Sequence, residues 1–363
     1  MLPWIFSILV ACSGRDGKDG TAQPYDPPDD GSDSDSATDG RDSGEGEDSG
    51  DGEDSGGGAD SGDDTDSGGD DTGEQSGPRG WTVVDLAPLT TLSSGQCPDL
   101  SKSGTSSFLS SGSERKVTVL LPESGAEGAP VVVFFHGLTT PDVSPEPTVE
   151  MAEGLYLQDV ADETGTIIVL PEAPVRDLFG YKFYLWMVEE TEGDDLVLYD
   201  DLRTCLSNEL NADLERFTAF GFSGGALFTT VVATRRADTL ATFIELSGGA
   251  DIEVPLFADL FAAYATPAWT LPGLLASGGD EDVWPSPSAP LVDFEAASDT
   301  FADLLVDDGH FVARCHHDNG HTITYDEYLL SIDWLSSHRF GQPSPYASAG
   351  LGDDSDWCAP MGE

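Results

Sequence analysis

The sequence predicts an α/β fold: a mainly parallel central sheet with helices on both faces. Three short apolar runs rich in β-branched or aromatic residues are bounded by Pro or Gly, as buried strands are, and they lie at 130–135, 166–170 and 217–222. Longer stretches of helical character separate them. Because strands that alternate with helices form right-handed βαβ units, we expect these strands to run parallel.

The weaker elements fit the same alternation. We expect two further strands and four helices, the strands at 116–121 and 273–276 and the helices at 149–164, 196–210, 224–237 and 301–308. A sheet of this kind carries its functional loops at the carboxyl ends of the strands. His136-Gly137, Pro171-Glu172 and Ser223 each follow a predicted strand closely, so we expect them along one edge of the sheet.

One folded domain is expected, over residues 81–363. The segment from Ser13 to Gly80 consists mainly of Gly, Ser, Asp, Glu and Thr, has Tyr25 as its sole aromatic residue and contains no Val, Ile, Leu or Phe. Such a composition cannot bury enough apolar surface to offset the conformational entropy lost on folding. We therefore expect 13–80 to be a disordered acidic linker.

The formal net charge is −53 at pH 7, and the linker does not account for all of it. Residues 13–80 hold 22 acidic and 4 basic residues, which leaves 46 acidic and 11 basic residues elsewhere. Phosphate backbones would be repelled, so a nucleic-acid partner is not expected. The acidity fits the solvation of an exported protein, and a compositional habit of the lineage explains it equally well.

Residues 1–12 end in Leu9-Val10-Ala11-Cys12, a short apolar run closed by a small residue directly before a cysteine. This resembles the lipobox of bacterial lipoproteins, which implies a lipid-anchored protein of the outer membrane, or an extracellular one. No Lys or Arg precedes Cys12, which a true start further upstream would explain. The alternative is a soluble protein whose N-terminus is apolar by chance.

Four further cysteines remain, at Cys97, Cys205, Cys315 and Cys358. An even number in an exported chain predicts two disulfides, and the sequence leaves all three pairings open. The spacings include no C-x-x-C, which argues against a zinc ribbon or a thioredoxin-like redox site.

The sharpest motif is GFSGG at Gly221–Gly225. A serine hydroxyl needs a base to take its proton and a sharp, uncrowded turn to expose it. The strand-like FTAFGF before Ser223 and the helical stretch after Gly225 supply the strand–turn–helix context of a nucleophile elbow. This context favours the α/β-hydrolase fold, with Ser223 as the nucleophile.

That fold orders its triad as Ser, then acid, then His, so the base must follow Ser223. His321 is preferred, since it lies in CHHDNGH in a Gly-containing loop after a strand-like segment at 311–314. The alternative makes His316 and His317 metal ligands together with Cys315. The two other downstream histidines, His310 and His338, are expected to be surface or helix-end residues.

The third member is a carboxylate that orients the imidazole, and GGDEDVWP offers three. Spacing does not separate the three cleanly; we favour Asp282, because a G-x-x-D turn then starts at Gly279, with Asp280 and then Glu281 as the alternatives. The oxyanion donors are expected to be the backbone N–H groups of Gly224 and Leu138. His136 is expected to brace the loop that carries Leu138.

Two tryptophans, Trp186 and Trp284, could line an acyl or aromatic pocket, although a tryptophan is more often a core or loop packing residue. The predicted chemistry requires no metal and no organic cofactor.

The order FFHG, LPEAP, GFSGG, GGDEDVWP, CHHDNGH resembles the secreted esterases of the poly(3-hydroxybutyrate) depolymerase and feruloyl or acetylxylan esterase type, over about 97–341. The resemblance implies a serine esterase that works through an acyl-enzyme. Two features depart from that pattern: Ser277-Gly278-Gly279 stands where the family has His-Gly near its acid, and the aromatic signature is only partly matched, at Trp186.

The sequence therefore predicts an exported, monomeric serine hydrolase that cleaves small-molecule or polymer esters. The alternatives are a peptidase of the same fold and a lipoprotein that keeps the fold for binding without catalysis.

Overall fold

The computed structural model describes residues 82–178, 180–188, 193–250, 263–288 and 290–362. The expected signal with Cys12 and the expected acidic linker lie outside these residues, so both stay predictions from the sequence. All statements below concern the described part of the chain.

The centre of the fold is a nine-stranded sheet whose order is β1-β2-β4-β3-β7-β8-β9-β12-β13. Six neighbouring strands, from β4 to β12, run parallel, while β2 is antiparallel to β4, β1 to β2, and β13 to β12. The strands are β1 Gly104–Ser110, β2 Ser113–Leu120, β3 Val131–Phe135, β4 Ile167–Pro171, β7 Phe217–Phe222, β8 Thr242–Leu246, β9 Gly273–Ser277, β12 Val312–His316 and β13 Cys358–Met361.

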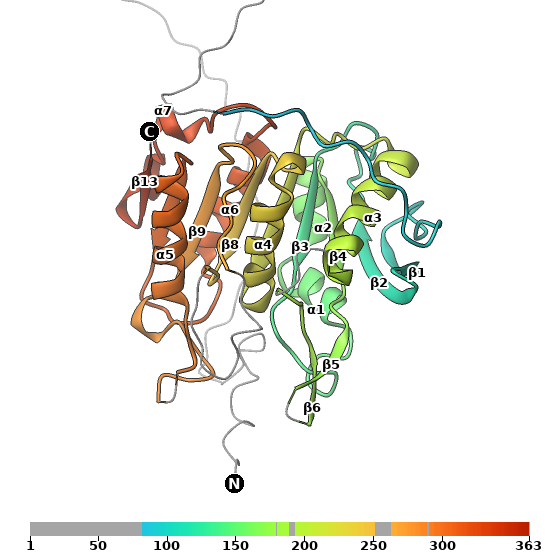
Figure 1. The fold of residues 1–363 in the computed structure, drawn as a ribbon, viewed down its shortest axis with the longest axis horizontal. Coiled ribbons are helices and arrows are strands. Elements are labelled where there is room, and N and C mark those ends of the chain that lie inside the picture. Colours follow the sequence, from blue (N-terminus) through green and yellow to red (C-terminus); the bar gives the residue numbers. More distant parts are fainter. Residues whose placement is uncertain (1–81, 179, 189–192, 251–262, 289, 363) are drawn as a thin grey trace, which may run out of the picture. The chain divides into compact units, whose positions relative to one another are not determined.

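Helices cover both faces of this sheet, as predicted (Figure 1). One face packs against α3, α4 and α5, and the other against α2 and α6. The helices are α1 Pro147–Gly154, α2 Leu157–Thr164, α3 Asp194–Leu210, α4 Gly224–Arg235, α5 Phe294–Asp307, α6 Tyr325–Ser337 and the short α7 Tyr346–Ala349. Among the described residues, none of the helices is both long and apolar enough to cross a membrane.

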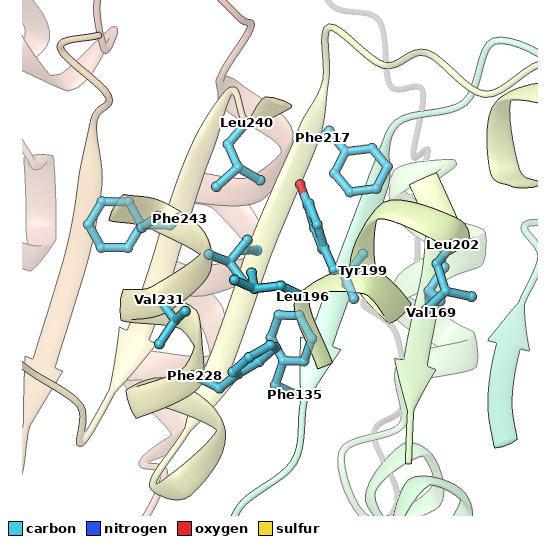
Figure 2. Close-up of a cluster of buried hydrophobic side chains, with 14 of the residues drawn as sticks. Phe135, Val169, Leu196, Tyr199, Leu202, Phe217, Phe228, Val231, Leu240 and Phe243 are labelled. Carbon is cyan, nitrogen blue, oxygen red and sulfur yellow. The ribbon is translucent and has the colours of Figure 1, made fainter. Parts of the chain in front are cut away.

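The core between the sheet and α3 and α4 combines aliphatic and aromatic side chains, and Figure 2 shows part of it. Phe135 of β3 contacts Phe228 of α4 edge to face, with ring centroids 4.9 Å apart, and Tyr199 of α3 contacts Phe217 of β7 in the same way. Burying each such side chain contributes about 1.5–3 kcal/mol. This packing fixes the helix that begins just after Ser223.

The predicted strands are confirmed to within a few residues, and two helix predictions need correction. The helix expected over 149–164 is two helices, α1 and α2, because Tyr156 takes a left-handed conformation with φ +51° that ends regular helical geometry. The helix expected at 301–308 is the second half of α5, which begins at Phe294 behind an Asp293 side-chain cap.

The sequence reading missed the central strand β8. Its residues TFIEL are all buried, yet Thr242 and Glu245 break the apolar run that signals a buried strand. Glu245 is one of the few carboxylates buried in the core of the described chain.

Short elements shape the edge at which the parallel strands end. β5 Val175–Leu178 and β6 Tyr181–Tyr184 form a hairpin shortly after β4, and this hairpin lies at the lower side of Figure 1. Tyr184 forms a β-bridge with Thr139, which follows β3. A 3₁₀ turn at Gly279–Glu281 follows β9, and β10 Val283–Trp284 pairs with β11 Val292–Asp293. The other 3₁₀ turns are Ala237–Thr239 and Gly352–Asp356.

The structure contains two disulfides, which correspond to one of the three pairings that the sequence left open. Cys97 joins Cys205 in α3, and Cys315 of β12 joins Cys358 of β13. The first closes a loop with a sequence separation of 108 residues, a length for which chain-entropy models give about 4–5 kcal/mol of stabilisation.

Candidate active site

Ser223 lies in the turn between β7 and α4 and has φ +56° and ψ −125°, a conformation that L-residues rarely adopt. The turn tolerates it because its flanks carry no side chains. A Cβ atom on Gly221 would come within 2.3 Å of the Gly225 carbonyl oxygen, and one on Gly225 within 1.9 Å of the Phe135 carbonyl oxygen. Gly221 and Gly225 are therefore required sterically.

His321 contacts this serine. Its Nε2 is 2.9 Å from the Ser223 Oγ, and its Nδ1 is 2.6 Å from Asp282 Oδ1. The loop that carries His321 lies against the acid loop so closely that a Cβ on Gly278 would be 2.0 Å from the Gly320 carbonyl oxygen. The Gly320 N–H also donates to the Gly278 carbonyl at 2.9 Å.

Asp282 is the carboxylate that reaches His321. It is fully buried, and its Oδ2 accepts hydrogen bonds from the Ser247 hydroxyl and the Gly278 N–H, both at 2.8 Å. Asp280 and Glu281, the other two candidates, are exposed in the 3₁₀ turn before it. The structure thus brings together Ser223, His321 and Asp282 and leaves the two alternatives outside.

Two aromatic rings enclose the imidazole of His321. Phe222 stacks on one side at a centroid distance of 5.0 Å and Phe294 at 4.6 Å, with interplanar angles of 25° and 14°. These contacts restrict the rotation of the imidazole.

The predicted oxyanion donors lie beside the serine. Gly224 directly follows Ser223, and a Cβ built on Gly224 would be 3.2 Å from the Leu138 nitrogen. A Cβ on Gly137 would be 3.3 Å from the Ser223 Cβ. The backbones of the two loops therefore approach closely. The N–H groups of Gly224 and Leu138 are near enough to bind the carbonyl oxygen of a substrate attached to the Ser223 Oγ.

His136 braces the loop that carries Leu138. Its Nδ1–H donates to the Gly137 carbonyl at 2.8 Å, and its Nε2 accepts from the Ala173 N–H at 3.1 Å. Burial lowers the pKa of His136 to about 4, so the ring is neutral at pH 7, which matches its one-donor, one-acceptor pattern. The backbone carbonyl of His136 in turn accepts from the Trp186 indole at 2.9 Å.

An apolar pocket opens beside Ser223, with a volume of about 60 Å³. Both predicted tryptophans contribute to its wall, Trp186 as a buried residue and Trp284 as a half-buried one. The complete lining is Leu138, Leu185, Trp186, Val188, Ser223, Gly224, Leu227, Trp284, Val292 and Phe294.

A buried ion pair supports one wall of this pocket. Asp195, at the start of α3, accepts from Arg115 at 2.7 Å and from the Met187 N–H at 2.9 Å. Arg176 of β5 also reaches Asp195, at 3.3 Å, and donates to the Leu185 carbonyl at 3.2 Å. These contacts hold the segment that contributes Leu185, Trp186 and Val188.

The remaining histidines have structural partners. Cys315 is in a disulfide and cannot supply a thiolate, which removes the metal site that the sequence left open with His316 and His317. His316 pairs with Glu295 at 2.7 Å. Across the described residues, no cluster of three or more His, Cys, Asp or Glu side chains could hold a metal ion.

His317 Nε2 lies 3.0 Å from the buried Glu327 carboxylate, which raises the pKa of His317 although burial opposes this. His310 and His338 both follow helices, but they are buried rather than on the surface. His310 Nδ1 is 3.0 Å from the Leu271 carbonyl oxygen, and His338 Nδ1 is 2.8 Å from that of Trp334.

Sequence reasoning missed three residues that contact the triad. Ser247, which has φ +54°, follows β8 and donates to Asp282. Phe222 and Phe294 stack on His321. Only Phe222 carried a signal, since it directly precedes Ser223; the others come from strands and helices distant in sequence.

The sequence matches no protein-family model and no curated protein. Solved structures do resemble the fold. A structure of pOPH in complex with DMSO superimposes with a TM-score of 0.58 at 16% identity, covering 74% of this chain and 96% of that one. Native sOPH gives a TM-score of 0.55 at 17% identity, covering 78% and 98%.

The strand order, the elbow between β7 and α4 and these likenesses show that the chain has the α/β-hydrolase fold. The level of identity establishes the fold alone, so the chemistry must be argued from the site.

Proposed function

We propose that this protein is a serine hydrolase that cleaves carboxylic esters through an acyl-enzyme on Ser223. The observation that carries this proposal is the continuous hydrogen-bonded chain from Asp282 through His321 to Ser223, with the serine held on a strained elbow. A buried carboxylate, an imidazole and a hydroxyl in this order are the parts that activate a serine.

In the first half of the reaction the Ser223 Oγ attacks the ester carbonyl, and the serine proton passes to Nε2 of His321. The negative charge that develops on the carbonyl oxygen is stabilised by the N–H groups of Gly224 and Leu138. Such preorganised donors are worth about 3–4 kcal/mol each. Asp282, which accepts from Nδ1, stabilises the imidazolium.

His321 then gives this proton to the departing alcohol oxygen as the ester C–O single bond breaks, which leaves the acyl group on Ser223. In the second half water loses a proton to His321 and attacks the acyl-enzyme; the acyl–Oγ bond breaks, the acid leaves, and His321 returns the proton to the Ser223 Oγ. The stacking of Phe222 and Phe294 keeps the imidazole facing both the serine and the leaving group throughout.

The test is hydrolysis of p-nitrophenyl butyrate by purified protein. We expect Ser223→Ala to lower kcat by at least about 10⁴-fold, since an activated nucleophile is lost. A fluorophosphonate probe should label the wild type at Ser223 and leave the variant unlabelled. Equal hydrolysis by both proteins would overturn the proposal, and a wild type that neither hydrolyses the ester nor takes up the label would favour the binding alternative.

We also propose that the chain is exported and tethered at Cys12. The two disulfides support an oxidising compartment, because cytosolic thiols are kept reduced. Expression in a bacterial host with radiolabelled palmitate tests this: the wild type should incorporate label and sediment with membranes, whereas Cys12→Ser should do neither. Unlabelled wild-type protein in the soluble cytosol would contradict it.

A further inference from the structure

We propose that the apolar pocket beside Ser223 receives the acyl half of the ester and selects short, uncharged, apolar acyl groups, with Leu227 and Trp186 setting the length limit. The inference rests on the proposed ester hydrolysis and names the substrate class of that site.

The position of His321 determines which half of the ester, acyl or alcohol, occupies the pocket. The alcohol oxygen must face Nε2 of His321 in order to receive its proton, whereas the acyl group stays on Ser223. The pocket is lined by Ser223, by both oxyanion residues, Gly224 and Leu138, and not by His321. It therefore lies on the acyl side, and the alcohol, small or polymeric, lies on the side of the histidine.

The polarity of the acyl group follows from the lining. Apart from Ser223 and the two indoles, the lining side chains carry no hydrogen-bond donor or acceptor. The N–H of Trp186 already donates to His136. An acyl group with a carboxylate or hydroxyl would lose hydration without gaining a partner, at a cost of roughly 2–7 kcal/mol for a neutral polar group and more for a charge.

The length limit follows from two fixed side chains. Trp186 is 2% exposed, stacks on Phe228 at 5.1 Å and meets Phe135 edge to face at 5.3 Å, so it forms an immobile wall. Leu227 lies one helical turn beyond Ser223, and its N–H donates to the Ser223 carbonyl at 3.1 Å. Neither can withdraw without breaking core packing.

The volume of the pocket gives the scale. A volume of about 60 Å³ is well below the roughly 150 Å³ of an apolar cavity that holds benzene. A short acyl chain can therefore enter the pocket, whereas dodecanoyl would have to leave most of its chain outside.

The first experiment measures kcat/KM for p-nitrophenyl acetate, butyrate, hexanoate, octanoate and dodecanoate, whose leaving group is constant. We expect the wild type to peak between two and six carbons and to fall at least about tenfold by dodecanoate. Leu227→Ala should move the optimum two to four carbons longer, and Leu227→Phe should move it toward acetate. Leu202→Ala, a core truncation away from the pocket, serves as the control for destabilisation and should keep the wild-type optimum.

The second experiment separates this inference from the proposed function. p-Nitrophenyl alkylphosphonates with methyl to decyl chains react once: the Ser223 Oγ–P bond forms, p-nitrophenolate leaves, and the serine proton passes to His321. The rate of labelling at Ser223, followed by mass spectrometry, should show the same length preference and the same shift in Leu227→Ala, whether or not any ester is turned over.

Length-dependent labelling without ester turnover would support the acyl pocket and defeat the proposed function. Ester turnover with equal rates at all lengths, or with an optimum unmoved in both Leu227 variants, would defeat the acyl pocket alone. Cleavage of a p-nitrophenyl monosuccinate as fast as the butyrate would also overturn it.

Discussion

Two buried acidic residues near the ends of neighbouring strands have different roles: Asp282 orients the catalytic imidazole, and Glu245 packs in the core. Asp282 follows β9 and Glu245 lies in β8, and both have contacts in the segment at 247–249. Asp282 accepts from the Ser247 hydroxyl, the Gly278 N–H and the His321 imidazole. Glu245 has the Thr230 hydroxyl and the Gly249 N–H, and no cationic or imidazole partner among the described contacts.

The two acids differ in what their contacts do. Burial raises the pKa of Glu245 to about 8. The Thr230 hydroxyl lies within reach of three acceptors, including the Gly249 carbonyl at 2.9 Å, so a proton on Glu245 completes this network. Glu245 is therefore a neutral packing acid at pH 7, whereas Asp282 orients the imidazole of His321.

The largest effect is expected when Asp282 loses its ability to accept from His321. Asp282→Asn should lower kcat for p-nitrophenyl butyrate by about 10⁴-fold with little change in KM, because an amide favours the wrong imidazole tautomer. Asp280→Asn, two residues earlier and exposed, is the matched control and should stay within about twofold of the wild type. Comparable losses in both variants would mean that Asp282 is not distinct.

Glu245→Gln should change the pH dependence of stability rather than activity. The unfolded glutamate titrates near 4.5 and the folded one near 8, so between these values the unfolded chain alone releases the proton and the free energy of unfolding falls as pH rises. Glutamine has no proton to release and mimics the neutral acid.

Titration of Glu245 lowers the free energy of unfolding of the wild type by about 4–5 kcal/mol between pH 4.5 and pH 8, a loss that Glu245→Gln does not show. Urea unfolding of the wild type and Glu245→Gln at pH 5, 6, 7 and 8 measures it, with the exposed Glu281→Gln as a control that should follow the wild type. A constant difference between Glu245→Gln and the wild type at all four pH values would contradict a neutral Glu245.

Ser247→Ala tests how much a single donor matters to Asp282. A hydrogen bond to a charged group is worth about 1.5–3 kcal/mol, so kcat should fall roughly 10- to 100-fold while KM is kept. Ser277→Ala removes a nearby hydroxyl that contacts Glu295 and Arg314 instead, and should leave kcat nearly unchanged. If the two variants behaved alike, Ser247 would have only a packing role.

The smallest effect is expected from the stacking on the imidazole. Phe222→Leu keeps most of the buried volume but removes one aromatic face, which is worth about 0.5–1.5 kcal/mol, so kcat should fall about two- to tenfold. Phe217→Leu, in the same strand and buried away from His321, is the matched control. A Phe222→Leu enzyme with unchanged kcat would show that Phe294 and Asp282 suffice to orient the ring.

The sequence predicted the elements whose signals are local. Ser223 could be predicted because its elbow requires glycine at fixed neighbouring positions, and the apolar strands could be predicted from short runs bounded by Pro or Gly. The sequence alone does not decide between Asp282, Asp280 and Glu281, since one or two residues of a 3₁₀ turn determine which carboxylate points inward. Ser247 was out of reach for a different reason: its contact joins residues 35 positions apart in sequence.

The close approach of Gly278 and Gly320 has a consequence for how this site can change over evolutionary time. The two loops share a backbone hydrogen bond and leave no space for a side chain between them, so neither can shift alone. The effective concentration of the Asp282 carboxylate at His321 is therefore set by main-chain geometry. Side-chain substitutions elsewhere leave this preorganisation intact. New substrates can be accommodated by altering the pocket walls, while the spacing of acid and base is inherited as a unit.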